Sequence, residues 1–299
     1  MTAFVRISEV DAASAARAAF DIDVLSAHRL DTERDDSFHL VTSTGEFGLK
    51  VAHPDDSAAL IDLQSSALAH AAASGLSLQR VVATGVINNR IARLLTWLPG
   101  TPLFETQIDE AQLEKLGRTL GILSASLADF EHPLARRPFI WDALQLPAVA
   151  ALAHLVPDPA IDEALALFER RVAPVLAELP MQVIHGDFHP GNILIASETV
   201  SVIDFGDVVY SARVADLAIA VSYLVTPLNR DPALFVRGFE EIVALEPIER
   251  EVLPLLVIAR LVQRILVNAD LTRGNPDNRS VVATDANLAA LRTLLSKEN

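Results

Sequence analysis

The residue types with the clearest chemical potential lie in residues 181–207, which read MQVIHGDFHPGNILIASETVSVIDFGD. An acid, Asp187, and an amide, Asn192, are separated by four residues in a loop between two apolar, β-branched runs. A third apolar run leads into the Asp-Phe-Gly that begins at Asp204. Short apolar runs broken by Gly, Pro and polar clusters are typical of strands, so these three side chains are predicted to lie at strand ends.

Phosphoryl transfer needs hard oxygen ligands for a magnesium ion and an acceptor for the proton of the attacking hydroxyl. Asn192 and Asp204 are candidates for the first role and Asp187 for the second. The alternative is a polar turn whose acids are merely solvated, and a lone Asp-Phe-Gly would favour it. Here the loop and the Asp-Phe-Gly occur together, in the order and with the spacing of a kinase catalytic loop, which favours the chemical interpretation.

HGDFHPGN followed by VIDFGD resembles the aminoglycoside phosphotransferase and choline kinase superfamily, in which His-Gly-Asp replaces the His-Arg-Asp of protein kinases. The resemblance implies a bilobal, protein-kinase-like α+β fold, with a small N-terminal antiparallel-sheet lobe and a larger, mostly helical C-terminal lobe. It also implies ATP or GTP as phosphate donor, Mg²⁺ and a small hydroxylated acceptor. His185, His189 and the helical Asp216 are then expected to support the loop rather than to bind metal.

The elements upstream must supply the nucleotide site. Residues 38–42 and 47–51 are predicted to form a hairpin, because a Gly-containing turn separates two short β runs. Lys50 lies on the outgoing strand, where the resemblance implies a phosphate-binding lysine. The preceding loop, LDTERDDSF, lacks glycines, as it does in several relatives. A leading helix is predicted over residues 9–27.

The next helix is predicted over residues 57–74, with Ser57 as its N-cap and Gly75 as its stop. In kinases, a glutamate on this helix pairs with the strand lysine. Gln64 occupies that position here and Asp62 precedes it. Because a glutamine accepts a hydrogen bond but cannot neutralise a lysine, the sequence leaves the partner of the lysine open.

Strands are predicted to continue to Leu95, and the Pro-Gly at residues 99–100 marks a connection that leaves the sheet. The resemblance places the adenine-binding backbone here, so Leu95, Thr96 and Trp97 are candidates for nucleotide binding, with core packing as the alternative for the tryptophan. The expected domains are a nucleotide-binding lobe over residues 1–98 and a catalytic and substrate-binding lobe over residues 99–299.

In the second lobe, Asp109 and Gln112 are typical of a capping box. Candidates for acceptor binding follow the Asp-Phe-Gly, and an arginine among them can bind a carboxylate through two hydrogen bonds. These candidates are Asp207, Tyr210 and Arg213. Weaker candidates, earlier in the chain, are Arg136, Arg137 and Asp142. Further helices are predicted over residues 159–179, 213–224, 235–244, 247–268 and 285–295.

Two longer stretches, LGRTLGILSASLADFEHPLARRPFIWD and IDFGDVVYSARVADLAIAVSYL, resemble hydroxylysine kinase-like proteins and the phosphotransferase domains fused to class III aminotransferases. This narrower resemblance makes a hydroxylysine-like amino acid the favoured acceptor. Aminoglycosides, homoserine, choline and ethanolamine are the alternatives. A nucleotide-binding regulatory pseudokinase is the alternative of another class, because the helix glutamate and the glycine-rich loop are missing.

The composition narrows the set of partners. A net charge of -15 argues against binding to nucleic acid or to an anionic membrane, and the absence of cysteine excludes disulfides and thiolate chemistry. The N-terminal residues lack the apolar core of a signal peptide, so a cytoplasmic protein is expected. The longest apolar run, residues 252–267, contains Arg260, Gln263 and Arg264, which is typical of a buried helix rather than a membrane span. The oligomeric state is left open.

Overall fold

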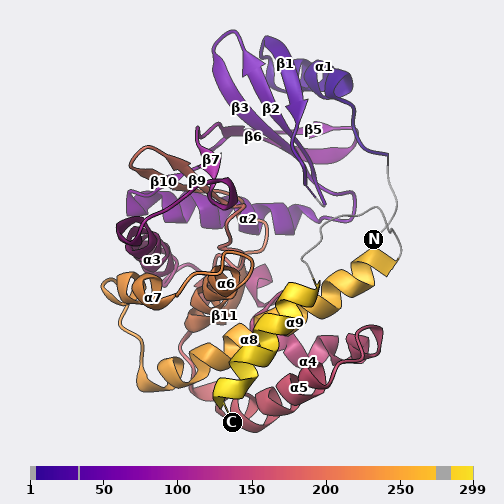
Figure 1. The fold of residues 1–299 in the computed structure, drawn as a ribbon. Helices are drawn as coiled ribbons and strands as arrows, with labels where there is room; N and C mark the ends of the chain where they lie inside the picture. Colours follow the sequence, from indigo (N-terminus) through magenta and orange to yellow (C-terminus); the bar gives the residue numbers. More distant parts are fainter. Residues whose placement is uncertain (1–4, 33, 274–283, 299) are drawn as a thin grey trace. The chain divides into compact units, whose positions relative to one another are not determined.

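The computed structural model describes residues 5–32, 34–273 and 284–298, and the chain divides into two compact units (Figure 1). The first unit comprises residues 1–100 and 194–203, and the second comprises residues 101–193 and 204–299. The domain boundary expected near residue 99 puts residues 194–203 in the second domain. The structure groups them with the first unit, where β10 (Thr199–Val202) pairs in parallel with β4 (Ser77–Leu78).

The first unit is built on an antiparallel sheet with the strand order β1-β2-β3-β6-β5. The predicted hairpin is confirmed as β2 and β3, which pair from Asp36 with Val51 to Thr42 with Gly45. The unit also contains β9, from its second residue on, beside β10. The bounds are α1 (Glu9–Phe20), β1 (Val24–Arg29), β2 (Asp36–Thr42), β3 (Gly45–Val51), α2 (Ala58–Ala71), β5 (Val81–Ile87), β6 (Arg90–Thr96) and β9 (Ile193–Ala196).

The prediction of one leading helix over residues 9–27 is wrong beyond Phe20. The helix ends because Asp21 adopts a left-handed conformation, with φ 51°, and its N–H bonds to the carbonyl of Arg17. Residues 24–29 form β1 instead, paired with β2. Small and apolar residues do not distinguish a helix from a strand by themselves, and here the pairing with β2 decides.

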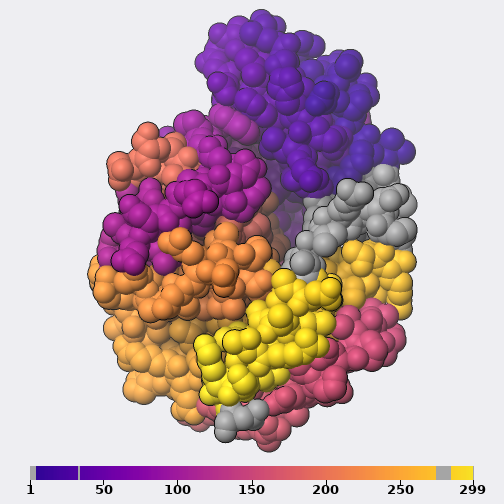
Figure 2. Space-filling view, in the orientation of Figure 1, coloured from indigo at the N-terminus to yellow at the C-terminus, as the bar shows by residue number. Residues whose placement is uncertain are grey.

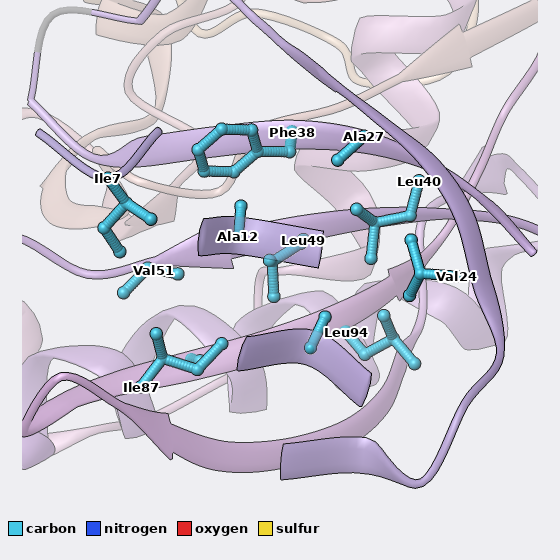
Figure 3. Close-up of a cluster of buried hydrophobic side chains, with 12 residues drawn as sticks. Ile7, Ala12, Val24, Ala27, Phe38, Leu40, Leu49, Val51, Ile87 and Leu94 are labelled. Carbon is cyan, nitrogen blue, oxygen red and sulfur yellow. The ribbon is translucent and has the colours of Figure 1, made fainter. Parts of the chain in front are cut away.

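The core of the first unit lies between α1 and one face of the sheet (Figure 3). Successive strand residues point to opposite faces, so Leu49 and Val51 enter this core while Lys50 lies on the other face. On β3, the residues that pack in the core and the candidate phosphate-binding lysine therefore lie on opposite faces of the sheet. The buried cluster includes Ile7, Ala12, Val24, Ala27, Phe38, Leu40, Leu49, Val51, Ile87 and Leu94.

The predicted helix after the hairpin is confirmed as α2, continued by a 3₁₀ turn at Ala72–Ser74. The hydroxyl of Ser57 accepts a hydrogen bond from the N–H of Leu60 at 3.2 Å. Gly75 ends the segment in the left-handed region, with φ 79°. Both end signals read from the sequence therefore act as expected.

The second unit is mostly helical, and its longest helix is α8. The capping box at Asp109 and Gln112 is confirmed at the start of α3. The helix predicted over residues 159–179 is α5 followed by a 3₁₀ segment, because Pro174 lacks an N–H and interrupts the α-helical hydrogen bonds. The helices are α3 (Glu110–Ser126), α4 (Leu146–Val149), α5 (Pro159–Arg171), α6 (Arg213–Val225), α7 (Ala233–Glu240), α8 (Pro247–Arg273) and α9 (Thr284–Glu298). The strands are β7 (Thr101–Pro102), β8 (Met181–Ile184) and β11 (Val209–Ala212). The 3₁₀ segments are Leu103–Glu105, Pro133–Arg136, Ala143–Gln145, Ala150–Leu155 and Ala173–Glu178.

Two glycines allow α3 and α7 to pack with their backbones in contact. A Cβ on Gly117 would lie 1.9 Å from the carbonyl oxygen of Phe235, and a Cβ on Gly238 would lie 2.1 Å from the carbonyl oxygen of Glu114. Real Cβ atoms do not approach other atoms so closely, so no other residue type fits at either position without separating the helices.

Among the described residues, α8 is the one helix long and apolar enough to span a membrane, and 78% of its apolar window is buried within the protein. It therefore fits the core helix of a globular unit. Helix α9 lies on the surface of the second unit (Figure 2) and is joined to α5 by the ion pair between Arg171 and Glu298, at 2.6 Å.

Candidate active site

The loop that carries Asp187 starts directly after β8 and is anchored by α6. Asp216, which is fully buried, accepts hydrogen bonds from the backbone N–H groups of His185 and Gly186, each at 2.8 Å. Gly186 has φ 81°, and a Cβ there would lie 2.5 Å from the carbonyl oxygen of Asp207. A buried helix and a glycine-only turn thus fix the start of the loop, with Asp216 in the position that the sequence analysis expected for loop support.

The carboxylate of Asp187 is held from two sides. On one side, Nδ2 of Asn192 donates to Oδ2 at 2.8 Å, and Nε2 of His189 lies 3.3 Å from the same oxygen. On the other side, Nη2 of Arg260 lies 3.6 Å from Oδ1. Asn192 also donates to the carbonyl oxygen of Asp187 at 3.1 Å, which closes the loop on itself.

These neighbours set the ionisation of Asp187. Although burial alone opposes the charged form, the positive charges of His189 and Arg260 hold the pKa of Asp187 well below its usual range. Burial likewise disfavours the charged form of His189, but the carboxylate of Asp187 raises the pKa of that imidazole. Asp187 is therefore a carboxylate at neutral pH, able to accept a hydrogen bond from a hydroxyl group.

The two histidines of the loop make structural contacts. Nδ1 of His185 accepts from the N–H of Asp187 at 3.3 Å, and its ring packs edge-on against Phe205 at 4.9 Å. Nδ1 of His189 accepts from the N–H of Gly191 at 3.0 Å, and its ring stacks on Tyr223 at 5.1 Å. Both rings therefore brace the loop.

Asp204 and Asn192 are the predicted metal ligands. Asp204 adopts φ 62° and accepts the N–H of Gly206 at 2.9 Å through Oδ1. Because Nδ2 of Asn192 is directed at Asp187, the amide oxygen is the atom left for a cation. This oxygen-only donor set fits a magnesium ion, which is bound through one or two carboxylates, phosphates and waters. Within the described part of the chain, no group of three or more His, Cys, Asp or Glu side chains is placed to hold a metal ion.

In the first unit, Lys50 pairs with an acid that the sequence analysis did not consider. Its Nζ lies 3.4 Å from Oδ2 of Asp35, in the connection before β2. Gln64, at the helix position of the kinase glutamate, accepts a hydrogen bond from Nη2 of Arg93 at 2.7 Å. Asp62 is exposed on α2. The structure thus places one acidic partner of the lysine in the connection before β2.

The three hinge candidates lie at the end of β6. Leu95 is buried, and the hydroxyl of Thr96 accepts the N–H of Arg80 at 2.9 Å. The ring of Trp97 stacks on His39, with centroids 3.8 Å apart and planes inclined by 14°. His39 in turn contacts Glu46 at 2.7 Å through Nε2.

The acceptor candidates have protein partners. Arg213 forms a two-point ion pair with the fully buried Glu249, including a 3.0 Å contact from Nε to Oε1, so its fork already holds a carboxylate of the chain. The ring of Tyr210 lies under the guanidinium of Arg136, at 3.4 Å. Arg137 donates a hydrogen bond to the carbonyl of Val208 at 2.6 Å, and Asp142 accepts one from the hydroxyl of Ser211 at 2.6 Å. The backbone carbonyl of Asp207 lies next to Gly186.

Sequence reasoning missed Arg260 as a neighbour of Asp187. Arg260 is 2% exposed on α8, donates to the carbonyl of Trp141 at 2.6 Å and lies over the indole of that residue. Arg264, one turn further on, is also buried, and burial lowers its pKa to about 10. The signal that could have indicated this contact is the presence of arginines within an apolar helix, because buried charged residues need partners.

A carboxylate held by an asparagine and a histidine of its own loop, in a chain that continues to an Asp-Phe-Gly, is typical of phosphoryl-transfer sites of the protein-kinase type. The fold agrees. An amicoumacin kinase, solved in complex with AMP-PNP, Ca2+ and Ami, superimposes with a TM-score of 0.69 at 16% identity over 93% of this chain and 91% of its own. A microcompartment-associated aminopropanol kinase gives a TM-score of 0.67 at 19% identity over 96% and 94% of the two chains.

The phosphotransferase enzyme family model matches residues 27–244, and the chain belongs to this family. Among curated proteins, the hydroxylysine kinase of Bos taurus is 28% identical over 93% of this chain and 86% of its own length. That of Danio rerio is 28% identical over 82% and 78%. The protein is therefore a small-molecule kinase with a bilobal, protein-kinase-like fold.

Proposed function

We propose that this kinase transfers the γ-phosphate of ATP or GTP to the hydroxyl of a hydroxylysine-like amino acid. The observation that carries the chemistry is the ionised Asp187, fixed by Asn192 at 2.8 Å. The acceptor is supported by the resemblance to hydroxylysine kinases along most of the chain. An amino alcohol or an aminoglycoside is the second candidate, because the chain also shares its fold with kinases named for such acceptors.

In this proposal the acceptor hydroxyl donates a hydrogen bond to the carboxylate of Asp187. Asp187 takes up the proton while the hydroxyl oxygen bonds to the γ-phosphorus, and the bond from that phosphorus to the leaving nucleoside diphosphate breaks. Asn192 and Asp204 would hold Mg²⁺, which neutralises charge on the phosphates. Lys50 would bind the phosphates, and the β6 end at Leu95, Thr96 and Trp97 would bind the base.

The proposal of an active kinase competes with the alternative of a regulatory pseudokinase. The support for a pseudokinase was the glutamine at position 64 together with the missing glycine-rich loop. Against the first of these, a carboxylate, that of Asp35, lies 3.4 Å from the ammonium of Lys50. Asp207, Tyr210 and Arg213 remain acceptor-binding predictions, the last in competition with Glu249. The cytoplasmic location and the absence of nucleic-acid or membrane partners also remain predictions.

The direct test is a phosphorylation panel with Mg²⁺, with products read by mass spectrometry. The acceptors are hydroxylysine, homoserine, serine, threonine, choline, ethanolamine, an aminopropanol and several aminoglycosides, each with ATP and with GTP. Phosphohydroxylysine as the preferred product supports the proposal. A phosphorylated aminoglycoside or amino alcohol in its place would keep the kinase and overturn the acceptor. Nucleotide binding without any product would favour the pseudokinase.

A further inference from the structure

Helix α6 follows the catalytic loop along one of its faces. Asp216, near the start of the helix, accepts the two backbone N–H groups at the beginning of the loop. Tyr223 lies seven residues later, which is two helical turns and therefore the same face of the helix. Its ring stacks on His189, with centroids 5.1 Å apart and planes inclined by 27°. Between the two on this face, Ala220 borders a small apolar cavity together with Phe188 of the loop. The helix thus contacts both the start and the middle of the loop.

His189 presents an N–H group to the catalytic carboxylate. Its Nδ1 accepts a hydrogen bond from the backbone N–H of Gly191 at 3.0 Å, so the ring proton lies on Nε2. Nε2 lies 3.3 Å from Oδ2 of Asp187, the oxygen that also accepts the amide of Asn192 at 2.8 Å. Because both donors meet the same oxygen, the carboxylate cannot rotate about its Cβ–Cγ bond without losing both contacts. The orientation of the His189 ring therefore decides whether the second donor is in place.

The ring of Tyr223 is itself held by the buried Arg264 of α8. The guanidinium lies 4.0 Å from the centroid of the ring, a distance typical of a cation–π contact. Its Nη1 donates to the carbonyls of Ser222 and Thr226 at 3.2 and 3.0 Å, at the end of α6, where carbonyls lack partners within the helix. Burial raises the pKa of Tyr223, although the charges of Arg260 and Arg264 oppose this effect. Tyr223 is therefore neutral and contributes a fixed ring rather than a charge.

We propose that Tyr223 is a positioning residue for phosphoryl transfer: its ring fixes His189, and His189 in turn fixes the carboxylate of Asp187. Asp216 and Tyr223 then divide the support of the loop along one face of α6, the first holding backbone groups and the second holding a side chain. This inference rests on the proposed function, in which Asp187 takes up the proton of the acceptor hydroxyl. A tyrosine that only filled the core would affect stability and leave the turnover of the folded protein unchanged.

The test compares Tyr223→Leu, which removes the ring, with Tyr223→Phe, which keeps it. Tyr223→Leu is expected to lower kcat by about tenfold or more, because a misplaced reacting group costs turnover. The acceptor KM and the nucleotide Kd should stay near their wild-type values. Tyr223→Phe should remain within about threefold of the wild-type kcat, since the ring contacts persist. The control is Phe239→Leu, which removes a fully buried ring from α7 and should lower the melting temperature without lowering kcat.

A double variant tests whether Tyr223 acts through the histidine. In a His189→Gln background, Tyr223→Leu should have little further effect on kcat, because the ring that it positions is gone. Full additivity of the two substitutions would overturn the inference. An equal loss of kcat in Tyr223→Phe and Tyr223→Leu would also overturn it, since the hydroxyl rather than the ring would then be responsible.

A measurement without turnover separates this inference from the proposed function. Nitrogen-15 NMR of histidine-labelled protein reports the tautomer of His189, whose signals are assigned by their loss in His189→Gln. We expect the proton on Nε2 in wild type and in Tyr223→Phe, and a mixture of tautomers in Tyr223→Leu, because a ring that turns loses the contacts that fix its tautomer. An unchanged tautomer in a folded Tyr223→Leu would overturn the inference. Circular dichroism melts identify a variant that fails to fold, in which case Tyr223→Met decides by the same criteria. An acceptor panel without product would count against the proposed function alone.

Discussion

The guanidinium of Arg260 lies 3.6 Å from the carboxylate of Asp187, although the two residues are 73 positions apart in the sequence. Arg260 is itself held by the carbonyl of Trp141 at 2.6 Å. A buried cation from the longest helix thus contacts one carboxylate oxygen, while the loop's own Asn192 and His189 contact the other. The orientation of Asp187 therefore depends on two separate parts of the second unit.

Replacing Arg260 by Gln should lower kcat by about 10²-fold, because the carboxylate loses one of its two restraints and small displacements of a reacting group are costly. The nucleotide Kd should change little. Arg260→Lys should retain more activity, since it keeps the charge. Steady-state kinetics with both substrates measure the effect, and Arg237→Ala, at an exposed pair with Glu114, serves as the control. A kcat at the wild-type level in Arg260→Gln would show that Asn192 and His189 suffice.

Removing the carboxylate itself should affect turnover rather than binding. In Asp187→Ala, we expect kcat to fall by about 10² to 10⁴-fold, the range for loss of a general base, with nearly unchanged nucleotide affinity. Rapid-quench measurement of phosphorylated product together with calorimetry separates the two quantities. Retained turnover would contradict the assignment of Asp187 as the base.

Removing the carboxylate of Asp216, which anchors the catalytic loop, should lower both the stability and the activity of the protein. Asp216→Ala leaves two buried N–H groups without an acceptor, those of His185 and Gly186. At about 1 to 3 kcal/mol for each of the two unsatisfied buried groups, the free energy of unfolding should fall by roughly 2 to 6 kcal/mol. Urea denaturation measures this change. Asp216→Asn keeps one acceptor oxygen and should lose less; equal losses would argue against the hydrogen-bond explanation.

The Asp36 cluster should make stability depend on pH. Although burial opposes ionisation, hydrogen bonds and charge from Arg90 and Arg29 hold the pKa of Asp36 below its usual value. Because the folded-state pKa is lower than the unfolded one, the stabilisation is fully present above about pH 4 and disappears as the pH falls through the lowered pKa. Asp36→Asn should cost about 3 to 5 kcal/mol at pH 7, since it removes the carboxylate that binds the buried Arg90. Urea titrations from pH 7 downwards should show wild type and variant converging in acid. A pH-independent difference would indicate lost packing instead.

The crossing of α3 and α7 should tolerate no side chain at its two glycines. Gly117→Ala and Gly238→Ala should each destabilise the protein by about 3 kcal/mol or more, because a Cβ would overlap the backbone of the other helix. Gly48→Ala is the matched control, since its Cβ would meet its nearest neighbour at 3.6 Å, an ordinary contact distance. Thermal melts compare the stabilities of the three variants. A Gly117→Ala variant as stable as wild type would mean that α3 and α7 can move apart at little cost in free energy.

Local sequence determined the elements whose signals are local. The β2–β3 hairpin follows from alternation and a glycine turn, α2 from Ser57 and Gly75, and the start of α3 from its capping box. The loop from His185 to Asn192 and the Asp-Phe-Gly are likewise readable, because phosphoryl transfer demands particular residue types at fixed spacing. From these the fold class and the enzyme class follow.

Tertiary structure decided which partner each charge takes. The structure adds Asp35 as a partner of Lys50 that the sequence did not indicate, and it pairs Arg213, a candidate for binding a substrate carboxylate, with Glu249. Pairing with β2 makes residues 24–29 a strand, and the packing of α8 places Arg260 beside Asp187. Spacing along the chain fixes neighbours only within a turn or a strand pair. Contacts between distant segments depend on how whole helices and sheets pack, and that packing is set by the summed burial of many side chains.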